Sequence, residues 1–271
     1  MRPVQRRVLH GSTCRGRYGD VSAKLGGTHG NFRPLGTGVF FIGNGGCRLS
    51  FTSLETYIPL YVEAAVLTAR LALWGILLSL VTGLAVGIIR YEKIPVLSQI
   101  ASAYIELSRN TPLLVQLFFL YFGLPKLGIR IPGEACAVIG LAFLGGSYMA
   151  EAFRSGIESV TVSQIESAEA LGLSRCQLFR YVILPQALEV SIPPICANVL
   201  FLIKETSVFS VVAVADLMYV AKDLIGLYYK TDEALLLLVL SYLIMLLPIS
   251  LGASVLERRI RHGRFGNPST V

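Results

Sequence analysis

Residues 156–188 read GIESVTVSQIESAEALGLSRCQLFRYVILPQAL, a polar stretch that interrupts an otherwise apolar chain and decides the fold. Ser163 and Glu166 have the spacing of a capping box, which predicts the start of a helix. Gly172 then fits the left-handed position at which many helices end. The first half of the stretch therefore predicts a short helix that stops at a bend.

A second helix is expected directly after this bend. Ser174 and Gln177 repeat the capping pattern, and the helix should run to Leu184, where Pro185 interrupts the backbone hydrogen bonds. The two helices together present an apolar face that has to be buried, made by Ile165, Ala168, Leu171, Leu178, Phe179 and Val182. We expect this face to be buried against the inner end of a membrane bundle or against another protein.

The same residues also look like a DNA-binding helix-turn-helix with Gly172 in the turn. Such a motif needs basic contacts to phosphates. This stretch offers only Arg175 and Arg180, which Glu166 and Glu169 offset. It is also tied to predicted membrane spans at both ends, so no nucleic-acid partner is predicted.

Long apolar runs flank the stretch on both sides. Apolar residues make up 54% of the 271 residues and charged residues 15%, against about 25% charged in a soluble domain. Runs without an ionisable group are long enough to cross roughly 30 Å of hydrocarbon. Five spans are expected, at residues 67–89, 100–124, 134–153, 184–203 and 234–256. The predicted fold class is an all-α polytopic membrane protein, with the cytoplasmic helix-turn-helix loop between spans three and four.

Basic residues set the orientation of the predicted bundle. Nine fall on the side that we assign to the cytoplasm: Arg90, Lys93, Arg154, Arg175, Arg180, Arg258, Arg259, Arg261 and Arg264. Four fall on the other side: Lys126, Arg130, Lys222 and Lys230. We therefore expect a multi-pass membrane protein. Its main body should begin outside, and residues 261–271 should form a cytoplasmic tail.

The first 50 residues differ from the rest of the chain. Residues 1–49 hold eight bases and one acid, which account for the whole formal charge of +7. They show no helical or alternating period, and placing so many bases outside contradicts the orientation rule. We expect residues 1–50 to be disordered or not part of the functional protein.

No catalytic or metal site is expected. The five cysteines and three histidines have no metal-ligand spacing. The chain contains no G-x4-G-K-[ST] phosphate loop, and an intramembrane enzyme would lack a convincing nucleophile–base pair.

The polar stretch resembles the cytoplasmic signature loop of bacterial ATP-binding-cassette (ABC) import permeases, E-A-A-x3-G-x9-I-x-L-P. The matching residues are Glu166, Ala168, Gly172, Leu184 and Pro185; Ser167 and Val182 depart conservatively from the pattern. Residues 109–125 and 204–217 resemble segments of the polar amino-acid branch of these permeases. The likeness covers about residues 60–260, the expected type-1 permease domain.

This resemblance implies a non-catalytic transport subunit for polar amino acids with a five-helix core, located in the bacterial plasma (inner) membrane. Its implied partners are a second permease subunit, identical or paralogous, a cytoplasmic ABC ATPase dimer and an extracytoplasmic substrate-binding protein. The loop would dock on the ATPase, which binds the ATP, so this chain would need no cofactor of its own.

Two groups of polar residues at membrane depth are candidates for the substrate pathway: Arg109, Asn110, Thr111, Lys204, Glu205 and Thr206. Such residues line cavities or pair with one another, and Glu106 lies at pairing distance from Arg109 on a helix. The alternative function is a secondary amino-acid transporter driven by an ion gradient, with Glu106 or Glu151 as a relay. The signature loop argues against it, since a secondary transporter has no ATPase to dock.

Overall fold

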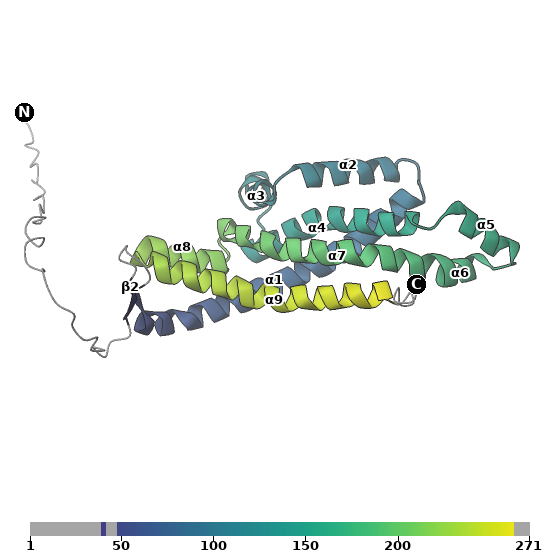
Figure 1. The fold of residues 1–271 in the computed structure, drawn as a ribbon. Coiled ribbons are helices and arrows are strands. Elements are labelled where there is room, and N and C mark those ends of the chain that lie inside the picture. The colour runs from purple at the N-terminus through teal and green to yellow at the C-terminus, as the bar shows by residue number, and fades with distance from the viewer. Residues whose placement is uncertain (1–38, 42–47, 263–271) are drawn as a thin grey trace, which may run out of the picture. The chain divides into compact units, whose positions relative to one another are not determined.

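Nearly all of the backbone that the structure describes is helical (Figure 1). This computed structural model describes residues 39–41 and 48–262. Strands β1 (Val39–Phe41) and β2 (Arg48–Ser50) pair antiparallel. The expectation that residues 1–50 are disordered or not part of the functional protein stays a prediction. The β-branched and aromatic residues of β1 favour extended backbone. The rest of that segment, and residues 263–271 of the expected tail, lie outside the described residues.

Four helices in the described part of the chain are long and apolar enough to cross a membrane: Tyr57–Tyr91, Gly133–Glu158, Arg175–Val212 and Thr231–Ile260. They contain the first, third, fourth and fifth predicted spans. The first begins ten residues earlier than predicted because helix α1 (Phe51–Tyr91) continues through its apolar N-terminal turns.

The second predicted span is not one continuous helix. Helix α2 (Leu97–Asn110) ends before Thr111, whose backbone is extended (φ −112°, ψ 127°) because Pro112 disfavours helical backbone in the residue before it. At 1.5 Å per residue, α2 rises about 21 Å, which is too short for the hydrocarbon core. The prediction of a single helix over residues 100–124 is therefore wrong.

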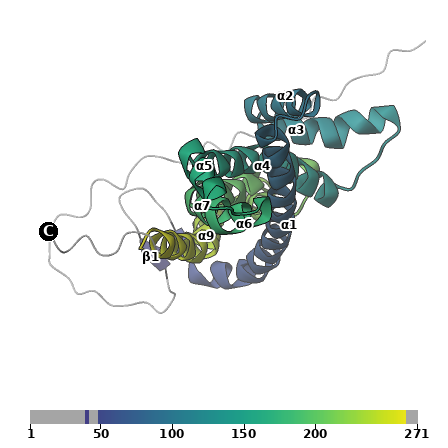
Figure 2. The ribbon, with the colours of Figure 1, turned by 90° about the vertical axis from the view of Figure 1, so that its right-hand side faces the viewer.

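Three short pieces continue the chain after this break. They are α3 (Leu113–Phe118), the π-helical turn η1 (Phe119–Gly123) and the 3-10 turn η2 (Leu124–Leu127). The views in Figures 1 and 2 show that α3 runs across the direction of α2.

Helices α1 and α4 (Gly133–Glu158) form the most extensive contact between elements. Glycines allow this approach: a Cβ on Gly83 would lie 2.4 Å from the Cβ of Met149, in the manner of small-residue interfaces in membranes. Ion pairs join Arg70 to Glu134 and Arg90 to Glu151. Because the two pairs occur in the same order along both helices, α1 and α4 run parallel.

The remaining helices complete two hydrophobic clusters. α7 (Leu184–Glu205) and η4 (Thr206–Val212) add Leu202 and Phe209 to the main cluster around α1 and α4. α8 (Leu217–Tyr228) and α9 (Thr231–His262) pack with the start of α1 in a second cluster.

Asp216 caps α8 within the second cluster. Its Oδ1 accepts the Tyr219 N–H at 2.9 Å, while its Oδ2 is buried without a hydrogen-bond partner. Burial raises the pKa of Asp216 to about 6.

Candidate functional site

The signature loop leaves α4 and begins with α5 (Val162–Ala170). Thr161 is the N-cap, and its backbone N–H donates to Oε1 of Gln164 at 3.3 Å in a capping box. The predicted box at Ser163 and Glu166 is therefore wrong by two residues, because Thr161 and Gln164 make the same exchange earlier in the chain.

The bend after α5 is confirmed. Gly172 has a φ of +81°, and its N–H donates to the Glu169 carbonyl at 2.9 Å. The second predicted capping box is also present: the Ser174 N–H donates to Oε1 of Gln177 at 2.9 Å.

The second loop helix does not stop at Pro185. α6 (Arg175–Leu178) widens into the π-helical turn η3 (Phe179–Ile183), and α7 follows with Pro185 in its first turn. A proline lacks an N–H and clashes with the carbonyl four residues earlier, and a wider turn relieves both conflicts. The predicted interruption is thus replaced by a continuous helical path from the loop into the membrane.

The apolar side chains of the loop do not share one buried face within this chain. Ala168 and Leu178 are buried, whereas Leu171 is 80% and Phe179 is 52% exposed. Figure 1 shows α5 and α6 at the end of the helices where α9 finishes. The loop therefore presents apolar surface there that this chain does not cover.

A cavity of about 330 Å³ lies where α2, α3, α4 and α7 meet. Of the six predicted pathway residues, four line it: Arg109, Asn110, Thr111 and Glu205. Lys204 is exposed and does not line this cavity. Thr206 is buried, and its hydroxyl donates to the Ile203 carbonyl at 2.7 Å.

Arg109 and Glu205 bring opposite charges to this cavity. The guanidinium carbon of Arg109 lies 5.0 Å from the ring centroid of Tyr148, within cation–π range. The ion pairs formed by described residues include neither Arg109 nor Glu205. The expected pairing of Glu106 with Arg109 is not among them.

Side chains satisfy the backbone at the break between α2 and α3. Asn110 and Thr111 donate to carbonyls four residues earlier in α2. The Nε2 of Gln116 donates to the carbonyls of Ser108 and Thr111 at 3.1 Å each. Carbonyls left without a donor would be costly at membrane depth. Gln116 was not among the residues predicted from the sequence, although an amide within the apolar run after Pro112 was a usable signal.

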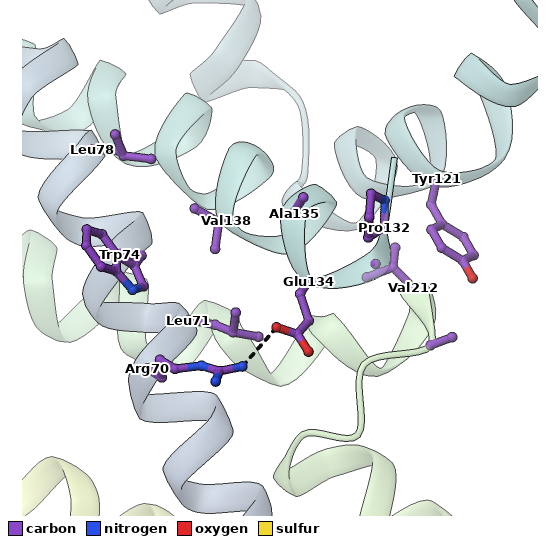
Figure 3. Close-up of a pocket in the computed structure, with 12 residues that line it drawn as sticks. Arg70, Leu71, Trp74, Leu78, Tyr121, Pro132, Glu134, Ala135, Val138 and Val212 are labelled. Atoms are coloured by element: carbon purple, nitrogen blue, oxygen red, sulfur yellow. Dashed lines mark hydrogen bonds and ion pairs between the residues drawn. The ribbon is translucent and has the colours of Figure 1, made fainter. Parts of the chain in front are cut away.

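A larger cavity, about 780 Å³, lies between α1 and the start of α4 (Figure 3). Arg70 and Glu134 form an ion pair in its wall at 2.9 Å, and Leu71, Trp74 and Val138 add apolar surface. Because these two charges satisfy each other, this cavity is a weaker candidate for a zwitterionic ligand than the one at Arg109.

Residues 75–262 match the family model described as binding-protein-dependent transport system inner membrane component. The chain belongs to this family. The probable glutamine ABC transporter permease protein GlnM of Bacillus subtilis is 37% identical over 182 residues, which are 67% of this chain and 84% of GlnM. The glutamine transport system permease protein GlnP of Escherichia coli K12 is 35% identical over 216 residues, 79% of this chain and 99% of GlnP.

A solved structure of an amino acid ABC transporter with histidines is similar with a TM-score of 0.72 and 33% identity, covering 78% of this chain and 99% of that chain. The chain is therefore a multi-pass inner membrane component, the permease subunit of an ABC importer. The predicted placement in the polar amino-acid branch is confirmed, and the secondary-transporter alternative is set aside. Inner membrane components of this kind work with an ATPase and a substrate-binding protein.

Proposed function

We propose that this permease subunit carries polar amino acids and that the cavity between Arg109 and Glu205 receives them. One observation supports this most strongly: a small cavity holds opposite charges that form no ion pair with each other. An amino acid brings a carboxylate and an ammonium group, and each needs a partner once water is removed. Relatives named for glutamine transport are consistent with this substrate class.

The signature loop is proposed as the docking element for the partner ATPase. Its expected residues are Glu166, Ser167, Ala168, Gly172, Val182, Leu184 and Pro185. The exposed Leu171 and Phe179 support this role, because an apolar surface of this kind suits a protein interface. In this proposal the ATPase activity and the bound ATP reside in the separate subunit, and this chain requires no cofactor.

The proposed topology has five crossings, with the signature loop and the C-terminus in the cytoplasm and the start of α1 outside. Helices α1 and α4 run parallel, so the chain between them has to return across the membrane. The segment from α2 to η2 makes this return, although no single piece of it is long enough alone.

The proposed assembly contains two permease subunits, identical or paralogous, two ATPase subunits and one extracytoplasmic binding protein. The permease domain covers about residues 60–260.

Much of the apolar surface of α9 is exposed in the single chain, including Val239, Leu243 and Ile244, and membrane lipid is its proposed neighbour.

The experiment is glutamine uptake by proteoliposomes that contain the chain with its ATPase and binding protein. Arg109→Gln and Glu205→Gln should each lower uptake by about tenfold or more, since a hydrogen bond to a charged group contributes roughly 1.5–3 kcal/mol. Lys204→Gln is the matched control, because Lys204 neighbours Glu205 in sequence but does not line the cavity. If Arg109→Gln takes up glutamine at the wild-type rate, this cavity is not part of the substrate pathway.

A further inference from the structure

A cluster of four charged side chains lies where α1 and α4 end, next to the signature loop. At its centre, the Glu151 carboxylate accepts hydrogen bonds from Arg90 of α1 and from Arg154 of α4. The Arg154–Glu151 contact is 2.9 Å, and Arg154 also pairs with Glu158 at 2.6 Å. Side chains of Arg90, Glu151 and Arg154 are only 25–29% exposed, so salt and water screen these contacts less than surface pairs.

Close backbone contacts surround this cluster. A Cβ on Gly87 of α1 would lie 3.2 Å from the Ala150 carbonyl of α4. A Cβ on Gly156 would lie 2.5 Å from the Ala187 carbonyl, at the start of α7. Both ends of the signature loop therefore emerge from helices that touch each other within one or two turns of Glu151.

The cluster is also one helical turn from the proposed substrate cavity. Tyr148 lines that cavity and lies beneath Arg109, and it precedes Glu151 by three residues, so the two share a face of α4. Arg90 lies at the end of α1, just before the connection to α2, the helix that carries Arg109.

We propose that Glu151 is a positioning residue that fastens α1 to α4 at the base of the signature loop. A displacement of the loop then moves α1 and α4 as one body and changes the walls of the cavity together. This inference rests on the proposed coupling of the loop to an ATPase. Without Glu151, the base of the loop is held less firmly to α1, α1 follows the loop less completely, and hydrolysis becomes poorly coupled to uptake.

The first test compares Glu151→Gln with Glu134→Gln in the complete reconstituted complex. Glu134 is the matched control, because it forms the other ion pair between α1 and α4, at the opposite end. In Glu151→Gln, uptake per ATP hydrolysed should fall by about tenfold, the change in a rate that about 1.4 kcal/mol produces, while ATPase binding stays unchanged. Glu134→Gln should couple like the wild type, and an equal loss in both variants would overturn the proposal.

The second test separates fastening from simple loss of charge. In a background without native cysteines, Arg90→Cys/Glu151→Cys should be poorly coupled until a short bis-thiol reagent joins the two positions. Recovery of coupling after cross-linking supports one moving body, whereas continued poor coupling or a complete block of uptake overturns it. If the wild-type chain binds no ATPase, the proposed function fails; if the wild type and Glu151→Gln couple equally, only this inference fails.

Discussion

Gly172 is a position where backbone strain in the signature loop can be changed without a steric clash. Its φ of +81° lies in the left-handed region, and a Cβ added there meets no atom within 4 Å. Gly172→Ala should therefore cost only the conformational penalty, about 1 kcal/mol. That penalty lowers the population of the native bend by up to about fivefold, and the apparent affinity for the ATPase should fall by the same factor.

Two further substitutions separate strain from charge. Asparagine tolerates left-handed backbone better than alanine, so Gly172→Asn should bind the ATPase more tightly than Gly172→Ala. Gly172→Asp has nearly the same shape as asparagine but adds a charge next to the exposed Leu171. Burying that charge in an interface is costly, so Gly172→Asp should bind most weakly of the three.

The assay is a titration of the detergent-solubilised chain with the partner ATPase, alongside substrate-stimulated ATP hydrolysis in proteoliposomes. Membrane levels of all variants should equal the wild type, because the spans do not depend on this bend. Equal affinity for the alanine and asparagine variants would refute the strain argument. Wild-type affinity and hydrolysis in Gly172→Asp would show that the loop is not the coupling element.

Three other predictions follow from particular contacts. Gly156→Ala should destabilise the solubilised protein by about 1–3 kcal/mol, because its Cβ meets a backbone carbonyl at 2.5 Å; Gly252→Ala has open space and should be neutral or stabilising in the same thermal denaturation. Asp216 has a folded-state pKa raised to about 6, above its ordinary value of 3.8, so the stability of the protein should fall as pH rises from about 4 to 6. Asp216→Asn keeps a helix cap, and it should flatten that profile and raise the melting temperature at pH 7. Cysteines introduced at Ser174 and Thr231 should react with an impermeant thiol reagent from the cytoplasmic and outer side respectively, and labelling at position 174 in intact cells would reverse the topology.

The sequence predicts this fold well wherever one local signal dominates. Uninterrupted apolar runs identify the helices around residues 71–89 and 234–256, and Gly172 marks the bend because few other residues adopt its backbone conformation. Prediction fails where two local signals compete. Pro112 lies in an apolar run of spanning length, and its effect on Thr111 divides the helix. Pro185 gives the opposite error, because a π-helical turn absorbs it and the helix continues.

The site was only partly predictable for a related reason. Ionisable residues in apolar surroundings single out Arg109 and Glu205, but the sequence does not say which neighbours turn toward the same cavity. Lys204 is adjacent to Glu205 and lies outside the lining, a difference of about 100° around the helix axis. Gln116 was missed because its role depends on carbonyls that are freed only when the helix breaks.

The two ion pairs between α1 and α4 also mark the two ends of the apolar section of these helices. Arg70 and Arg90 are about 30 Å apart along an ideal helix, and Glu134 and Glu151 are about 26 Å apart, close to the thickness of the hydrocarbon core. No Asp, Glu, Lys, Arg or His lies between them on either helix. Helices α1 and α4 thus share a hydrophobic belt, and the charged residues at both of its ends are costly to move into the bilayer. In a thicker membrane the lipid has to thin around this belt, and in a thinner one the helices have to tilt. Bilayer thickness consequently acts as a mechanical load on α1 and α4, and α4 leads directly into the signature loop.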